Sequence, residues 1–121
     1  MNLYQERLLS YYKNPQFIGI VEQENMMGTT SNPSCGDSLR LSARIENGVV
    51  TSMKYQGVGC VISRASAAMV CEHAMGKTID ELKKISVERI ISMLNVELGP
   101  NRMRCATLVL SALEEGLKAL C

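Results

Sequence analysis

The sequence predicts an α+β fold in which a small antiparallel three-stranded sheet carries helices packed on one face. Apolar and polar residues alternate from Leu39 to Ile45, just before an Asn47-Gly48 pair, and a period of two ending in such a pair is typical of a β-hairpin. From Ser63 onward the apolar residues recur at helical spacing instead. Strands followed by a run of helices are typical of the α+β class. At 121 residues the chain is long enough for one core, so we expect a single domain over 1–121.

The residues before the hairpin predict a helix, a short strand and a loop. Residues 4–13 have an amphipathic pattern that ends at Asn14-Pro15, where the residue before proline avoids helical dihedrals. We expect a strand from Phe17 to Val21. Residues 25–34 are rich in Gly, Thr, Ser, Asn and Pro, and this composition predicts a loop.

The hairpin after Ile45 has two candidate registers. A two-residue loop would place Leu41 opposite Lys54, whereas a three-residue loop places Leu41 opposite Met53 and keeps the apolar side chains on one face. We therefore predict the three-residue loop, with Gly48 in the left-handed conformation.

Helices are predicted over most of the remaining chain. Residues 63–75 are rich in Ala and Met and end at Gly76, which suits a C-cap. Thr78 and Glu81 have the spacing of a capping box, Ser86 can cap a helix that runs to about residue 94, and Asn101 can cap the final helix.

Composition excludes several classes of partner. The net charge of +1 gives no electrostatic basis for binding nucleic acid or an anionic membrane. The first residues lack the pattern of a signal peptide, and no apolar run reaches about 18 residues, so we expect a cytoplasmic protein. Five cysteines in a reducing compartment indicate metal or redox chemistry rather than disulfides.

Three cysteines lie where a thiol is easily exposed and ionised. Cys35 is in a Pro-Ser-Cys-Gly-Asp turn with Asp37 two residues on, Cys60 falls between a strand and a helix, and Cys105 opens the last helix. A helix N-terminus lowers a cysteine pKa, and the thiolate is the form that binds metal or attacks sulfur. We therefore expect Cys35, Asp37, Cys60 and Cys105 to form one metal or cluster site.

The motifs around these cysteines resemble those of the IscU/NifU-type iron-sulfur scaffold family. They are Cys35-Gly-Asp37, Gly57-Val-Gly-Cys60-Val-Ile-Ser63 and Arg104-Cys105-Ala-Thr-Leu108. The resemblance covers nearly the whole chain and implies a scaffold with the IscU/SufU-like fold.

The resemblance also implies what the site does. Cys35, Cys60 and Cys105 would take sulfur from a cysteine desulfurase, hold a transient [2Fe-2S] cluster with iron, and pass it to apo iron-sulfur acceptor proteins. Asp37 would complete the site and favour cluster release. Zinc often occupies this site in resting members of the family. Tyr4 resembles a tyrosine that members use in self-association, which would give a homodimer.

Two departures leave a second function open. Arg104 stands where the IscU branch has histidine, and guanidinium cannot bind metal; Arg104-Cys105 resembles instead the SufU branch, whose insertion between the second and third cysteines is absent here. The alternative is therefore a zinc-dependent sulfurtransferase in which Cys105 accepts persulfide sulfur. Residues 98–102 differ from the segment that an Hsp70-type chaperone grips, which argues against that partner. A structural zinc domain is the third interpretation.

The other candidate residues have ordinary interpretations. Cys71 and His73 lie roughly 16 and 20 Å along the helix from Cys60, and Cys121 roughly 24 Å beyond Cys105, so we expect structural or surface roles for all three. Three thiolates and a carboxylate around a +2 centre leave about two uncompensated negative charges. Nearby cations should offset this excess, and the candidates are Arg64, Arg102 and Arg104.

Overall fold

The computed structural model describes residues 3–32, 36–94 and 99–120 of the chain. The elements follow in the order α1 (Leu3–Lys13), the 3₁₀ turn η1 (Pro15–Phe17), β1 (Met26–Asn32), β2 (Asp37–Glu46), β3 (Val49–Val58), α2 (Val61–Ala74), α3 (Ile79–Lys83), α4 (Val87–Leu94) and α5 (Pro100–Lys118).

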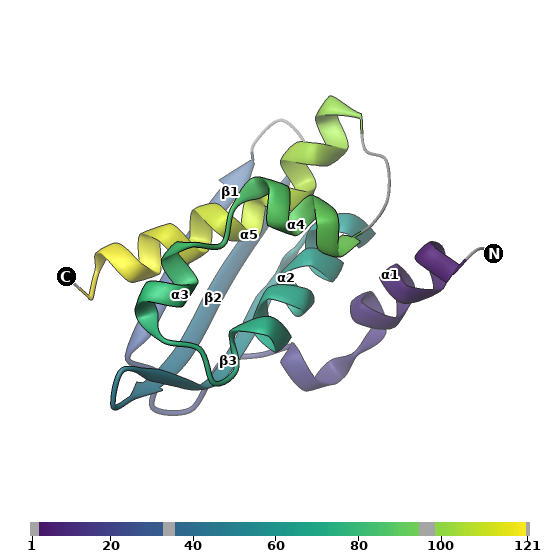
Figure 1. Ribbon diagram of the computed structural model, residues 1–121. Helices are drawn as coiled ribbons and strands as arrows, with labels where there is room; N and C mark the ends of the chain where they lie inside the picture. Colours follow the sequence, from purple (N-terminus) through teal and green to yellow (C-terminus); the bar gives the residue numbers. More distant parts are fainter. Residues whose placement is uncertain (1–2, 33–35, 95–98, 121) are drawn as a thin grey trace.

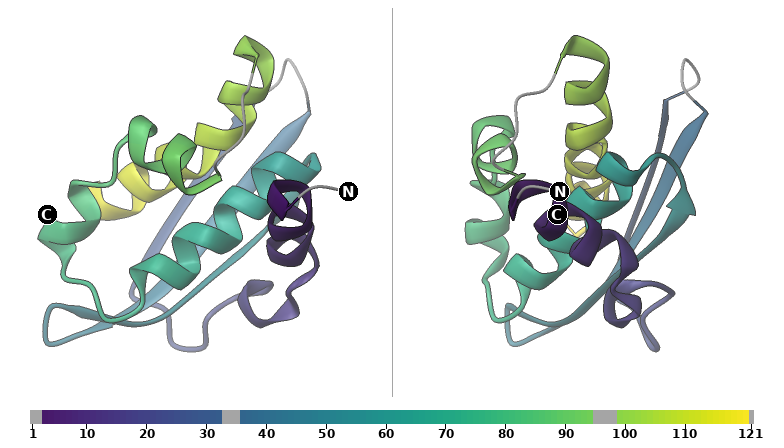
Figure 2. Two further views of the ribbon diagram at one scale, coloured as in Figure 1. Left: turned by 45° about the vertical axis from the view of Figure 1, so that its right-hand side comes forward. Right: turned by 90° about the vertical axis from the view of Figure 1, so that its right-hand side faces the viewer.

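The three strands form an antiparallel sheet in the order β1-β2-β3, and the helices cover one face of it (Figures 1 and 2). Helix α5 lies over β1 and β2, α2 lies over β3, and α1 packs on α2. The predicted α+β class, with a three-stranded sheet under helices, is confirmed. None of the helices in the described part of the chain combines the length and the apolar character needed to cross a membrane.

The first strand of the sheet differs from the predicted one. Residues 26–32, expected to be loop, form β1, whereas Phe17 ends a 3₁₀ turn and Ile18 makes only an isolated bridge to Tyr55. β1 is strand because its inward side fits closely under α5: a Cβ atom on Gly28 would lie 1.9 Å from the Ala112 carbonyl oxygen. The glycine that suggested a loop is therefore what lets the helix approach the sheet.

The predicted three-residue hairpin loop is also wrong. Asn47 and Gly48 alone form the turn, both with positive φ (54° and 76°), as a type I′ turn requires. A register shift between Arg44 and Ile45 then places Leu41 opposite Tyr55. An extra residue in β3 thus restores the apolar face that a simple two-residue hairpin would lose.

The predicted helix caps are largely confirmed. Gly76 has φ 78°, the Thr78–Glu81 capping box is formed, and the Ser86 hydroxyl accepts the Arg89 N–H. Helix α5, however, begins at Pro100 after Gly99, not at Asn101, because proline suits the first helical position, where its missing N–H costs nothing.

Candidate metal centre

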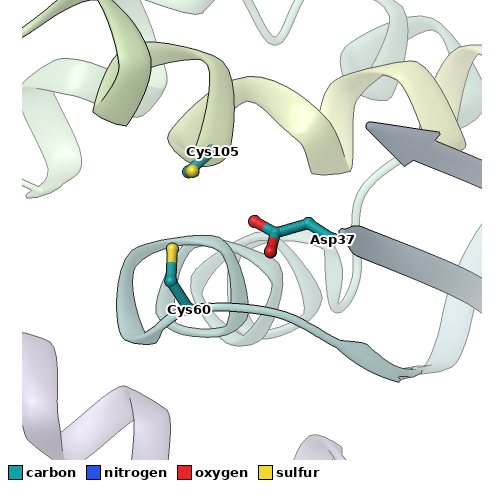
Figure 3. Close-up of side chains that lie close together, drawn as sticks. All are labelled: Asp37, Cys60 and Cys105. Atoms are coloured by element: carbon teal, nitrogen blue, oxygen red, sulfur yellow. The ribbon is translucent and has the colours of Figure 1, made fainter. Parts of the chain in front are cut away.

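Asp37, Cys60 and Cys105 come from three different elements and meet at one end of the sheet (Figure 3). Asp37 begins β2, Cys60 is the N-cap residue of α2, and Cys105 is in the second turn of α5. A carboxylate oxygen and the two sulfur atoms all lie within 4.8 Å of one another. This spacing allows all three side chains to bind a single metal ion or cluster.

The backbone around Asp37 and Cys60 directs their side chains into this site. The sheet pairing ends with Asn32 opposite Asp37, and Gly36 precedes Asp37 with φ 74°. At Gly59 a Cβ atom would lie only 3.2 Å from Asp37 Cγ. Glycine at position 59 therefore leaves space for the Asp37 carboxylate.

The Asp37 carboxylate is buried and incompletely paired. The residue is 5% exposed, and among the described residues its Oδ2 atom has no hydrogen-bond partner. A buried carboxylate is costly unless it is paired or coordinates a metal. The donor set of one carboxylate and two thiols suits Zn²⁺ or iron, and a cation would supply the partner that Oδ2 lacks.

Cys60 and Cys105 differ in access. Cys60 is exposed, whereas Cys105 is 9% exposed. The Ser63 hydroxyl lies 3.7 Å from Cys60 Sγ and donates to the Cys60 carbonyl oxygen at 3.1 Å. Ser63 is part of a cysteine motif in the sequence, but the sequence analysis assigns it no role. Its position three residues after Cys60, at the start of a helix, is the feature that predicts a contact with that cysteine.

The Cys105 thiol does not have the lowered pKa that a helix N-terminus would give. Burial, together with the neighbouring Cys60 and Asp37, raises the pKa of Cys105 to about 12, and burial is the largest cause. The expectation of easy ionisation is therefore wrong for Cys105 in the metal-free protein, because the thiolate would be buried beside other acidic groups. A bound cation reverses this balance by favouring the deprotonated ligand.

The other predicted site residues either lie apart from Asp37, Cys60 and Cys105 or fall outside the residues that the structure describes. Cys35, Cys121 and the side chains of Tyr4 and Arg102 fall outside the described residues. Arg104 is exposed and is not ion-paired with Asp37, and the Arg64 guanidinium lies 4.9 Å from the centre of the Tyr12 ring. The Cys71 side chain is buried. The described part of the centre thus consists of Asp37, Cys60 and Cys105.

Comparison with known proteins agrees with this geometry. The zinc-dependent sulfurtransferase SufU of Bacillus subtilis is 32% identical over 95% of this chain and 89% of its own. The iron-sulfur cluster assembly scaffold protein IscU of Thermotoga maritima is 30% identical over 98% of this chain and 94% of its own. Both alignments span 134 residues against the 121 of this chain, so both relatives have residues that this chain lacks.

The fold leads to the same relatives. The crystal structure of FiSufU, a protein of the SUF system from Fervidobacterium islandicum AW-1, matches with a TM-score of 0.79 and 27% identity, over 93% of this chain and 94% of that one. The family model of the NifU-like N-terminal domain matches residues 3–120. The chain therefore belongs to the NifU-like N-terminal domain family, which is the family its cysteine motifs resemble.

Proposed function

We propose that this protein is an iron-sulfur cluster assembly scaffold. It accepts sulfur from a cysteine desulfurase, combines it with iron, and holds a labile [2Fe-2S] cluster on Cys35, Cys60, Cys105 and Asp37. The observation that carries this proposal is the convergence of Asp37, Cys60 and Cys105 within 4.8 Å. The scaffold function named for the Thermotoga maritima relative supports it.

Sulfur enters by thiol-persulfide exchange. A thiolate of the scaffold attacks the outer sulfur of the desulfurase persulfide, the S–S bond of that persulfide breaks, and the desulfurase cysteine leaves as a thiolate. The scaffold cysteine then carries the persulfide. Each transferred sulfur needs two electrons from a separate reductant before it becomes the sulfide of a cluster.

Cys60 and Cys105 have different requirements in this exchange. Cys60 is exposed at the start of α2, where a partner can reach it. Cys105, the residue that we predict as the acceptor in a sulfurtransferase, has a pKa raised to about 12 by burial and by the neighbouring Cys60 and Asp37. Cys105 therefore becomes a useful nucleophile only when a cation in the site stabilises its thiolate. Zinc in the resting protein would supply that cation.

Asp37 makes the cluster easier to release. A carboxylate is a harder ligand than a thiolate and binds an iron-sulfur cluster less strongly. One oxygen ligand among three sulfur ligands therefore favours transfer to an acceptor protein that offers cysteine in its place.

Anaerobic reconstitution with ferrous iron, cysteine, a reductant and a cysteine desulfurase tests the proposal. The wild-type protein should develop visible cluster absorption, and Cys60→Ala or Cys105→Ala should abolish or greatly weaken it. Cys71→Ser is the matched control, because Cys71 is a buried cysteine on α2 outside the centre. It should retain the cluster.

The same experiment separates the scaffold from a zinc-dependent sulfurtransferase. A colourless wild-type protein that raises cysteine turnover by the desulfurase would contradict the scaffold proposal and support the sulfurtransferase. If the protein showed neither cluster absorption nor an effect on cysteine turnover, only the interpretation as a structural zinc domain would remain. Loss of cluster absorption in Cys71→Ser, with its fold intact by circular dichroism, would overturn the ligand assignment.

A further inference from the structure

A second site of concentrated charge lies among residues of α2, α3, α4 and the loops between them, away from the candidate metal centre. Figure 1 shows how these three helices are arranged. A cavity of about 470 Å³ there has four basic side chains in its wall: His73, Lys77, Lys84 and Arg89. A second hollow of about 370 Å³ shares His73, Lys77 and Arg89 with it. His73 is 13 residues beyond Cys60, or about 20 Å along α2 at 1.5 Å per residue, so this region does not touch the metal centre.

The positive charges around the cavity are not neutralised by ion pairs. In the described part of the chain, no carboxylate lies within 4.0 Å of the charged nitrogen atoms of these four residues. The two acidic side chains beside them have other partners. Glu81 accepts hydrogen bonds from the N–H and hydroxyl of Thr78, and Glu72 accepts one from the Tyr11 hydroxyl. Glu81 also attracts Lys77 and Lys84 across the cavity, but one carboxylate does not balance the charges of Lys77, Lys84 and Arg89. A bound anion would relieve the repulsion that remains.

His73 reports the positive field in the cavity. Burial lowers the pKa of His73, and Arg89 and Lys77 lower it further, while Glu81 opposes them. Arg89 comes from α4 and Lys77 from the loop after α2, so the positive field reaches His73 from two sides of the cavity, while Glu81 on α3 opposes it. An anion bound beside His73 would act in the opposite direction and raise its pKa.

The start of α4 adds a further positive element to the wall. Ser86, which lines the cavity, precedes α4, and its hydroxyl accepts the Arg89 N–H. The first N–H groups of a helix have no acceptors within the helix and carry the positive end of its dipole. Anions, and phosphate groups above all, bind such positions readily when cationic side chains stand beside them.

We propose that this cavity binds a small anion bearing two linked phosphate groups, with Arg89 and Lys77 as its main ligands. Arg89 offers a planar fork that matches phosphate oxygens, and Lys77 offers a mobile point charge. Lys84 and protonated His73 supply further positive charge, which suits a diphosphate better than a single phosphate. The cavity volume is in the ordinary range for small-ligand sites. At a given charge of the diphosphate, protonation of His73 strengthens binding because it adds a positive charge.

Titration with inorganic pyrophosphate tests the proposal on the full, metal-free chain at constant ionic strength. Calorimetry should give saturable binding of one pyrophosphate. The imidazole signals of His73 in NMR should report a higher pKa in the complex than in the free protein. Lys77→Ala and Arg89→Ala should each weaken binding about 10-fold or more, the loss expected for a hydrogen bond to a charged group. Arg89→Lys should retain part of the affinity.

The control is Lys118→Ala, which removes an exposed positive charge at the end of α5, outside this cavity. Its affinity for pyrophosphate should equal that of the wild-type protein. A second arm with a nucleoside diphosphate asks whether the diphosphate belongs to a nucleotide: tighter binding than pyrophosphate identifies that source. Non-saturable binding, an unchanged His73 pKa, or an equal loss in Lys118→Ala would overturn the proposal, because each outcome indicates only general attraction of anions to a basic surface.

Discussion

At the scale of single residues, the geometry of the candidate metal centre depends on Gly59, a residue that cannot bind metal. Gly59 lies beside both Asp37 and Ser63, and a Cβ atom there would lie 2.4 Å from the Ser63 hydroxyl oxygen and 3.2 Å from Asp37 Cγ. The first distance is far below van der Waals contact. An alanine at position 59 must therefore displace the carboxylate, the hydroxyl beside Cys60, or both.

We predict that Gly59→Ala weakens Zn²⁺ binding about 10-fold or more, the effect typical of disturbing groups that orient metal ligands. Competition against a zinc-binding dye measures the change. Gly99→Ala is the matched control, because a Cβ atom there meets nothing within 4 Å. Equal zinc affinity in Gly59→Ala and the wild-type protein would show that the Asp37 carboxylate does not need its present position.

Cys71 predicts a pH dependence of stability. Burial raises the pKa of Cys71 far above its ordinary 9.0, so the folded protein keeps the thiol protonated at a pH where the unfolded chain ionises it. This contribution is fully present below pH 9.0 and is lost as the pH rises above it. The loss reaches at most about 1.4 kcal/mol per pH unit.

Urea unfolding at about pH 8 and about pH 10 measures this effect through the linkage of protonation to folding. Cys71→Ala should be less stable than the wild-type protein at the lower pH, by about 1 kcal/mol for a small buried side chain, and should lose less stability on going to the higher pH. Tyr55 and Cys105 also have raised pKa values and are present in both proteins. Cys71 contributes to the raised pKa of Tyr55, so its removal reduces that shift as well and acts in the same direction. Parallel losses in the two proteins would contradict the assignment to Cys71.

At the scale of elements, the contact between β1 and α5 positions the helix that contains Cys105. A Cβ atom on Gly28 would lie 1.9 Å from the Ala112 carbonyl oxygen and 2.6 Å from the Gly116 nitrogen. Both are backbone atoms of a helix, so neither can rotate away. We predict that Gly28→Ala lowers the free energy of unfolding by about 1–3 kcal/mol, as overpacking does.

The measurement is the urea midpoint of Gly28→Ala beside that of Ser31→Ala, an exposed position on the same strand. Because α5 must move to admit the methyl group, metal affinity at Cys105 should fall in Gly28→Ala as well. A Gly28→Ala midpoint equal to that of Ser31→Ala would mean that the strand and helix separate at no cost.

The same contact explains which elements the sequence predicts. Helices α2 to α4 and the hairpin turn have local signals, such as Gly76, the capping box and Asn47-Gly48, so they can be predicted without the rest of the chain. β1 cannot, because Gly28 stabilises that strand only through its packing against a helix about 80 residues away. The prediction of the hairpin register is wrong for a related reason. The packing of the apolar face, and not the turn, determines the register shift between Arg44 and Ile45.

At the scale of the whole molecule, the candidate metal centre is a product of tertiary structure. Local motifs identify Cys60, Cys105 and Asp37 as candidates. The raised pKa of Cys105 does not follow from its place near a helix start, because burial between α2, β2 and α5 decides it. The role of Gly59 is likewise visible only when Asp37 and the start of α2 are brought together. Sequence therefore predicts which residues come together in the candidate centre better than it predicts their chemical state.

Because the candidate centre forms only when the chain folds, metal binding should be linked to folding. The unfolded chain does not hold Asp37, Cys60 and Cys105 within 4.8 Å, so a metal ion binds mainly the native state and stabilises it by mass action. At a free Zn²⁺ concentration 100 times the dissociation constant, the gain is about 2.7 kcal/mol. Thermal unfolding should therefore shift to higher temperature when zinc is added and return to its starting point when a chelator removes the metal.

Two variants make this measurement specific. Cys105→Ala should abolish most of the zinc-induced shift, since it removes a ligand from α5, whereas Cys71→Ser should keep the full shift from a lower starting temperature. Zinc binding with no change in the unfolding temperature would mean that the unfolded chain binds zinc as tightly as the folded one. That result would contradict the prediction, because a metal site formed only by the folded arrangement of β2, α2 and α5 must bind zinc more tightly in the native state.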